Sequence, residues 1–189
     1  ARYFMYSQVY FHPVRRAYDR HLQHFMIDWL GPKGIPTDIE RFLELTDDEV
    51  LAEIRKASIQ QDHKGHTSAC RITKRKHFKV LYERNANDVK RNTQAATAVY
   101  DATKKKFGGN NVEFDEYRQK QSGTEFPLRL RDGRVVSSIA ESEVLANLPL
   151  VAVEYVFVAP EIRDKAELWL NQNREKIIAP GNNVEGDEL

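Results

Sequence analysis

The chain has 189 residues, of which 41% are apolar and 30% are charged. This composition can bury a core beneath a charged surface, and no apolar run reaches the length of a membrane span. With 29 basic and 28 acidic residues, the net charge of +1 argues against a general nucleic-acid binder. The single cysteine, Cys70, excludes an internal disulfide and a thiolate zinc site. We therefore expect a reducing, cytoplasmic location.

The first part of the chain has the apolar periodicity of helices. Spacings of three and four predict one long helix over residues 3–30, with a kink near Val9 because Pro13 interrupts its hydrogen bonds. Gly31 should end this helix. Thr37 and Asp38 should start a second helix. Thr46 is followed by acidic residues, Asp47, Asp48 and Glu49, and is expected to cap the start of a third.

From about residue 71 the pattern changes to alternating strands and helices. We predict strands at 71–84, 112–117 and 151–158, helices at 88–107 and 160–178, a helical turn at 142–147, and a hairpin at 128–136 that turns at Asp132-Gly133. This order predicts an α+β fold, in which an all-helical segment precedes a small antiparallel sheet with two helices on one face, as in ferredoxin-like domains. The expected units are a helical segment 1–60, a connecting loop 61–70, an α+β domain 71–178 and a disordered acidic tail 179–189.

Sequence motifs give little direct evidence of catalysis. There is no glycine-rich phosphate loop and no nucleophile elbow. Two histidine pairs, His21 with His24 and His63 with His66, have spacing that could serve a metal, but neither has an evident third ligand nearby. We interpret both pairs as surface residues, and we assign no catalytic or metal-binding residue to this chain.

The first predicted helix carries a more informative stripe. Arg2, Tyr6 and Tyr10 recur every four residues and so lie on one side of a helix, with His12 on roughly the opposite side. From composition alone, the simplest interpretation is that the tyrosines pack in the core with their hydroxyls at its edge.

Three segments resemble one family. Residues 1–12, ARYFMYSQVYFH, are similar to the Arg-x7-Tyr-x-His helix of the HD-domain deoxynucleoside triphosphate (dNTP) triphosphohydrolases. Residues 45–51, LTDDEVL, are similar to the segment that follows that helix in the family. Residues 75–79, RKHFK, resemble its Arg-x-x-Phe-Lys strand. The resemblance covers most of residues 1–85 and extends more loosely to the hairpin and the last helix.

The resemblance implies roles for particular residues. Arg2 falls where the family contacts the substrate triphosphate, and Tyr10 falls where a tyrosine packs against the deoxyribose. Tyr6 occupies a position where some relatives place a histidine near the scissile phosphate. A second set falls where members that need activation bind a nucleotide effector between the subunits of a tetramer: His12, Arg75 and Lys79. In that second set, Pro13 replaces the lysine that often follows the histidine.

The family's metal site is not encoded in these residues. It needs a His-Asp dipeptide with a further His and Asp, and no His-Asp dipeptide occurs in the chain. We therefore expect the divalent metal in a segment that precedes Ala1. The chain would then be the C-terminal part of a dNTP triphosphohydrolase, inactive alone, and would supply surfaces for substrate, effector and homo-oligomer contacts.

Two other functions remain open. The chain could be a non-catalytic module for nucleotide sensing or oligomerisation. It could also bind nucleic acid through a basic segment, although the net charge gives no support and strand alternation would divide the cations between two faces. That segment contains Arg71, Lys74, Arg75, Lys76 and Lys79.

Overall fold

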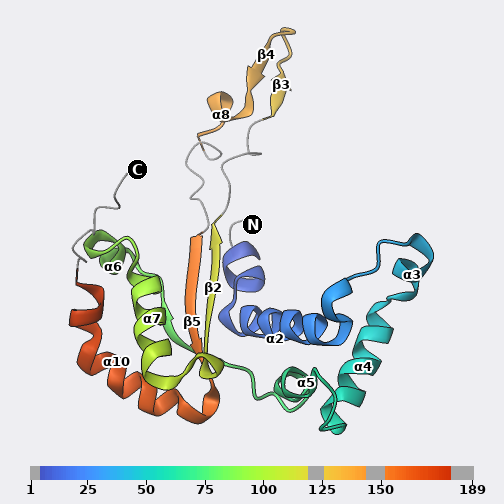
Figure 1. Ribbon diagram of the computed structural model, residues 1–189. Helices are drawn as coiled ribbons and strands as arrows, with labels where there is room; N and C mark the ends of the chain where they lie inside the picture. The colour runs from blue at the N-terminus through green and yellow to red at the C-terminus, as the bar shows by residue number, and fades with distance from the viewer. Residues whose placement is uncertain (1–4, 119–125, 144–151, 180–189) are drawn as a thin grey trace, which may run out of the picture.

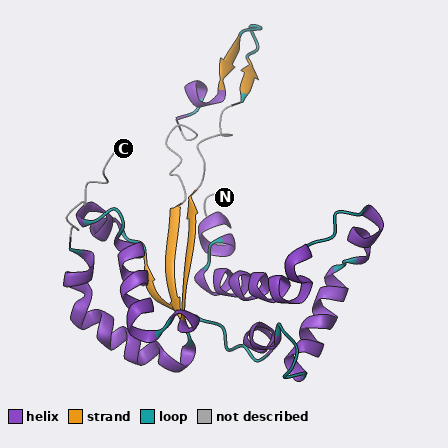
Figure 2. Cartoon of the chain, in the orientation of Figure 1, coloured by secondary structure: helices purple, strands orange, loops and turns teal. Residues whose placement is uncertain are grey.

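The computed structural model describes residues 5–118, 126–143 and 152–179 (Figure 1). Arg2, residues 180–189 of the predicted tail and most of the turn expected at 142–147 lie outside the described residues. In the described part, no helix is both long and apolar enough to cross a membrane. The fold is α+β, as the sequence predicted, with helices around a small antiparallel sheet (Figure 2).

The N-terminal half is helical. Its elements are η1 (Tyr6–Tyr10), α2 (Pro13–Leu30), η2 (Gly31–Lys33), α3 (Ile39–Glu44), α4 (Asp47–Ile59) and α5 (His66–Thr73). The predicted cap at Thr46 is confirmed, since its side chain accepts a hydrogen bond from the first turn of α4. The second helix starts where expected, and the Asp38 side chain caps α3 in the same way. The single helix predicted over 3–30 is wrong. His12 leaves the helical region and Pro13 is the first residue of α2, because proline suits that position and disfavours helical geometry in the residue before it.

The strand predicted over 71–84 is mostly wrong. Strand β1 covers only Lys79–Glu83, and α5 begins at His66, inside the expected loop 61–70, and continues to Thr73. Ile72, which fitted the alternating pattern, instead packs against the small core between α2, α4 and α5. Local alternation did not distinguish a short strand from the end of a short helix.

The predicted helix over 88–107 is two helices, α6 (Ala86–Arg91) and α7 (Ala95–Phe107). Asn85 caps α6 by accepting a hydrogen bond from the backbone N–H of Asp88. The Asp88 side chain is buried and accepts hydrogen bonds from Tyr82 and Arg174. These contacts fix α6 in place, and the extended backbone of Asn92 then separates it from α7.

The remaining elements are η3 (Gly109–Asn111), β2 (Val112–Arg118), β3 (Pro127–Arg129), β4 (Val135–Ser137), α8 (Ser138–Glu141), β5 (Ala152–Val158), η4 (Pro160–Ile162) and α10 (Arg163–Ile178). The strands, the hairpin and the last helix among them follow the prediction closely, whereas η3 and α8 were not predicted. β3 and β4 form the predicted hairpin, and Gly133 in its turn has a φ of 89°, which glycine adopts without strain.

The main sheet has the order β1-β5-β2, with both neighbours antiparallel to β5. β1, α7, β2, β5 and α10 follow one another as in a ferredoxin-like domain, and the described residues supply three of that fold's four strands. One face of the sheet packs against α7 and α10, with Val156 and Val158 at the centre. The other face carries Tyr155 and Phe157 and is covered by α2 (Figure 1).

Gly65 allows α5 to approach α2 closely. A Cβ atom at this position would lie 2.7 Å from Cδ2 of Phe25, a side chain with no exposed surface. We predict that Gly65→Ala lowers the free energy of unfolding by about 1–3 kcal/mol, because the buried ring has little room to move. Gly109→Ala is the control, since its Cβ would meet only the flexible Lys104 side chain at 3.4 Å. Urea unfolding of both variants measures the difference, and equal midpoints would contradict the prediction.

Candidate functional site

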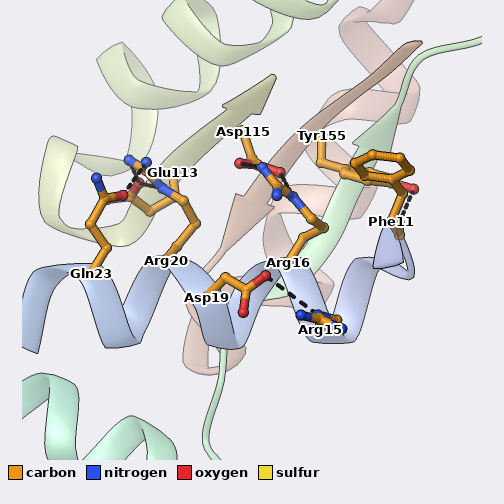
Figure 3. Close-up of polar contacts among 9 residues, drawn as sticks. All are labelled: Phe11, Arg15, Arg16, Asp19, Arg20, Gln23, Glu113, Asp115 and Tyr155. Carbon is orange, nitrogen blue, oxygen red and sulfur yellow. Dashed lines mark hydrogen bonds and ion pairs between the residues drawn. The ribbon is translucent and has the colours of Figure 1, made fainter. Parts of the chain in front are cut away.

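The central contact of the molecule is an ion pair between α2 and β2. The guanidinium of Arg16 donates two hydrogen bonds of 2.6 Å to the carboxylate of Asp115 (Figure 3). Asp115 is only 4% exposed, so its charge depends on this partner. The hydrogen bond to Asp115 raises the pKa of Arg16 above its ordinary value, which keeps the guanidinium charged.

A second pair lies one helical turn along α2. Arg20 donates to Glu113 at 2.9 and 3.2 Å, and Nε2 of His24 lies 3.4 Å from the same carboxylate. Near the start of the helix, the Tyr155 hydroxyl donates to the carbonyl of Phe11 at 3.0 Å. Burial raises the pKa of Tyr155 to about 12, so the hydroxyl keeps its proton. Together these contacts hold α2 across the sheet face (Figure 3).

These contacts position an aromatic hollow at the start of α2. The rings of Tyr6 and Tyr10 lie 5.4 Å apart, Tyr6 is 5.8 Å from Phe11, and Phe11 is 4.5 Å from Tyr117 on β2. With Met5 they line a hollow of about 540 Å³. Tyr10 is 43% exposed, and the guanidinium carbon of Arg15 lies 5.2 Å from its ring centroid. The tyrosines therefore form a surface that a ligand can reach, rather than part of the buried core.

The structure brings together only part of the predicted site. Tyr6 and Tyr10 are adjacent, whereas Arg2 lies outside the described residues. His12 caps α2, since its Nδ1 accepts a hydrogen bond of 3.3 Å from the backbone N–H of Val14. The assignment of these residues to substrate or effector stays a prediction.

Arg75 and Lys79 lie toward the other end of the sheet. Lys79 pairs with Val158, and Tyr117 pairs with Val153, which is about 16 Å away along β5. The Nζ of Lys79 lies 3.1 Å from Nε2 of His77. The His77 ring in turn lies 4.6 Å from the ring of Tyr18, so Lys79 is beside the first half of α2 rather than beside His12.

The described residues do not fit the metal site of an HD phosphohydrolase. They contain no group of three His, Cys, Asp or Glu side chains placed to hold a metal ion. The histidine pairs have other partners: His24 contacts Glu113, His63 contacts Glu53, and His66 contacts the carbonyl of Ala57.

His21 is a buried part of the same helix. Its Nε2 accepts a hydrogen bond of 3.1 Å from the backbone N–H of Phe78, and the side chain is 4% exposed. Burial, followed by the nearby charge of Arg71, lowers the pKa of His21 to about 4. The imidazole is therefore neutral near pH 7.

Sequence reasoning did not identify the residues that hold α2. Arg16 and Arg20 are four apart on a helix, and Glu113 and Asp115 are two apart on a strand. These spacings correspond to about 6 and about 7 Å, which nearly match. That agreement is a usable signal only once the two elements are known to be in contact.

Substitution of Arg16 should lower the stability of the chain much more than substitution of an arginine in an exposed ion pair of α2. Arg16→Ala leaves the Asp115 carboxylate buried without its partner, so we expect the free energy of unfolding to fall by about 3–5 kcal/mol. Arg15→Ala is the matched control, because Arg15 forms only exposed contacts, a 3.7 Å pair with Asp19 and a cation–π contact with the Tyr10 ring, and it should cost about 1 kcal/mol or less. Chemical denaturation measures both, and a similar loss in the two variants would refute the assignment.

His21 predicts a specific pH dependence of stability. Its pKa is about 4 in the folded chain and about 6.5 when unfolded, so the unfolded chain takes up the proton first as pH falls. Stability should decrease from about pH 6.5 to about pH 4, by up to about 1.4 kcal/mol per pH unit. In His21→Gln, an amide oxygen replaces the acceptor for the backbone N–H of Phe78. The decrease in stability that protonation of His21 causes should then disappear. Parallel pH profiles for the two proteins, measured by urea unfolding, would show that His21 does not contribute.

Comparisons with known proteins agree with this architecture. A hypothetical protein of known structure from Aquifex aeolicus is 30% identical over 89% of this chain, with a TM-score of 0.72. A phosphohydrolase structure from Bacteroides thetaiotaomicron is 16% identical over 84% of this chain, with a TM-score of 0.53, and so supports the fold. The chain spans 42% and 47% of the lengths of these two proteins. A search of curated proteins gave no match.

The family comparison covers the helical half and the residues that lead into the sheet. Residues 1–108, more than half of the chain, match the model described as the HD associated region. This segment contains η1, α2 and two tyrosines of the aromatic hollow, Tyr6 and Tyr10. The chain therefore belongs to the HD associated region family.

Proposed function

We propose that this chain is the C-terminal part of a metal-dependent dNTP triphosphohydrolase, which converts a dNTP and water to deoxynucleoside and triphosphate. The observation that carries the proposal is the exposed tyrosine hollow, in a segment that matches the HD associated region. The resemblance of residues 1–12 to the substrate-binding helix of these enzymes adds the substrate class.

The hollow has a suitable shape for the sugar and base of a nucleotide. Tyr6, Tyr10 and Phe11 offer ring faces and edges against which a deoxyribose or a base can pack. Arg15, held over Tyr10, adds a cation at the rim. We assign substrate positioning to Tyr6 and Tyr10, together with Arg2, and nucleotide effector contacts to His12, Arg75 and Lys79.

In this proposal the chain binds and orients the nucleotide but does not hydrolyse it. The described residues lack a donor set for the divalent metal. We therefore propose that the metal ligands belong to protein outside residues 1–189, and we assign no catalytic step to this chain.

An assembly role is the second candidate, and a specific surface favours it. Apolar side chains on and before α3 are unusually exposed, among them Ile39 at 72%, Leu43 at 69% and Phe42 at 53%. Apolar surface of this kind is typical of a contact with another protein surface. Contacts within a homo-oligomer would use such a surface without any nucleotide chemistry.

Nucleotide binding by the chain tests whether the aromatic hollow holds a nucleotide. We expect dATP or dGTP to bind weakly in isothermal titration calorimetry, and Tyr10→Ala to weaken the affinity about tenfold through loss of ring contact. Tyr10→Phe keeps the ring and should bind almost normally. Tyr18→Ala, on the same helix but beside His77, is the matched control. Equal binding by Tyr10→Ala and the unmodified chain would exclude the hollow.

Hydrolysis tests the rest of the proposal. With Mg²⁺ or Mn²⁺, residues 1–189 should release no deoxynucleoside, whereas a longer polypeptide that includes the metal-binding segment should release deoxynucleoside and triphosphate. Product from residues 1–189 alone would contradict our view of the metal site. Lack of product and of nucleotide binding in both proteins would favour the assembly role.

A further inference from the structure

A second concave surface lies at the other end of α2. It is a groove of about 460 Å³ between α2 and α5, closed by the residues that enter β2. Its lining includes His21, Thr67, Ser68 and Arg71, which make no contact with the aromatic hollow. His12 and His21 are nine residues apart, about 14 Å along the helix, so the two surfaces are separate.

His21 brings an unused hydrogen-bond donor to this groove. Its Nε2 is occupied as the acceptor for Phe78, and the neutral imidazole therefore carries its proton on Nδ1. In the described part of the chain this N–H has no hydrogen-bond acceptor, and the residue is only 4% exposed. Because His21 lines the groove, this N–H can donate to an acceptor that enters there.

Ser68 adds a second buried polar group. Its side chain is 8% exposed and lines the groove, and its hydroxyl has no hydrogen-bond partner among the described residues. Thr67, beside it, offers another hydroxyl. Both residues are in the first turn of α5, which has no side-chain cap, so their backbone N–H groups also lack helical acceptors.

Arg71 supplies a positive charge one turn further along α5. Its Nη1 is used by Glu161 and by the carbonyl of Lys76, while its Nε and Nη2 have no partner in the described residues. The guanidinium carbon lies 5.1 Å from the ring centroid of Phe78, which holds the group in place. Residues 67, 68 and 71 share one side of α5, so their donors point toward a common region.

The acidic residues of the groove do not cancel this set of donors. Glu113 is compensated by Arg20. Asp28 is exposed at the rim. The wall formed by His21, Thr67, Ser68 and Arg71 thus presents N–H and O–H donors.

We propose that this groove binds a phosphate group, with the guanidinium of Arg71, the hydroxyl of Ser68 and the Nδ1–H of His21 as donors. Charge-assisted bonds from arginine and several neutral donors suit the oxygens of a tetrahedral anion. This proposal does not depend on nucleotide binding in the aromatic hollow, because the groove uses none of the residues of the hollow.

Titration with inorganic phosphate at low ionic strength tests the site. In ¹H–¹⁵N correlation spectra we expect saturable shifts at the amides of Ser68 and Arg71. Arg71→Gln should weaken binding about tenfold and Ser68→Ala about threefold to fivefold, in line with the loss of one charged and one neutral hydrogen bond. Arg163→Gln, an exposed arginine on α10, is the control and should leave binding unchanged.

A further variant separates binding from stability. Glu161→Gln removes the carboxylate that competes for Arg71, so phosphate should bind about twofold to fivefold more tightly, whereas a purely structural role for the pair would give no gain. Tyr10→Ala should leave phosphate binding unchanged. The experiments therefore distinguish a failure of nucleotide binding in the aromatic hollow from a failure of phosphate binding in the groove. Absence of saturable binding, or equal losses in Arg71→Gln and Arg163→Gln, would overturn the proposal.

Two sources could provide the phosphate. Inorganic phosphate and inorganic triphosphate should bind similarly if the groove recognises only the anion. A dNTP that binds more tightly than triphosphate in Tyr10→Ala would show that the groove also contacts the nucleoside. Tighter binding of triphosphate than of phosphate would indicate that the groove holds more than one phosphate unit.

Discussion

The buried pair between Arg16 and Asp115 is the constraint on which the rest of the structure depends. A neutral hydrogen bond such as that from Tyr155 to the Phe11 carbonyl contributes about 0.5–1.5 kcal/mol, whereas breaking a buried ion pair costs about 3–5 kcal/mol. The pair therefore dominates the attachment of α2 to the sheet. Arg20 and Glu113 repeat it one turn later and fix the direction of the helix.

Both concave surfaces follow from this attachment. At its N-terminal end, α2 brings Phe11 against Tyr117, and this contact closes one side of the aromatic hollow. Toward its C-terminal end, it places His21 against the backbone of Phe78 and beside α5. The first surface is aromatic and the second presents hydrogen-bond donors, so a single helix supports two sites with different chemical preferences.

The sequence predicted elements whose signals are local. Thr46 caps α4 as expected, and α3 starts after Asp38 as expected, because capping needs only the next three residues. Ile72 was misassigned to a strand, and the separate helix α6 around Asp88 was missed, because both depend on contacts outside the local pattern: the core that contains Phe25 for the first, Tyr82 and Arg174 for the second. The same contrast between local and long-range signals holds for the site. The tyrosines were found through a resemblance within residues 1–12, whereas the buried role of Arg16 depends on a partner 99 residues later.

The contacts of α2 also determine what can fold as a unit. The family match ends at residue 108, yet the carboxylates that hold α2 belong to Glu113 and Asp115 on β2. Without them, the guanidinium of Arg16 and the aromatic ring of Phe11 would lose the surface on which they pack. The HD associated segment and the sheet that follows it are therefore parts of one cooperative structure. It follows that a truncation at the family boundary would remove Tyr117 and the support of the aromatic hollow while leaving Tyr6 and Tyr10 in the chain.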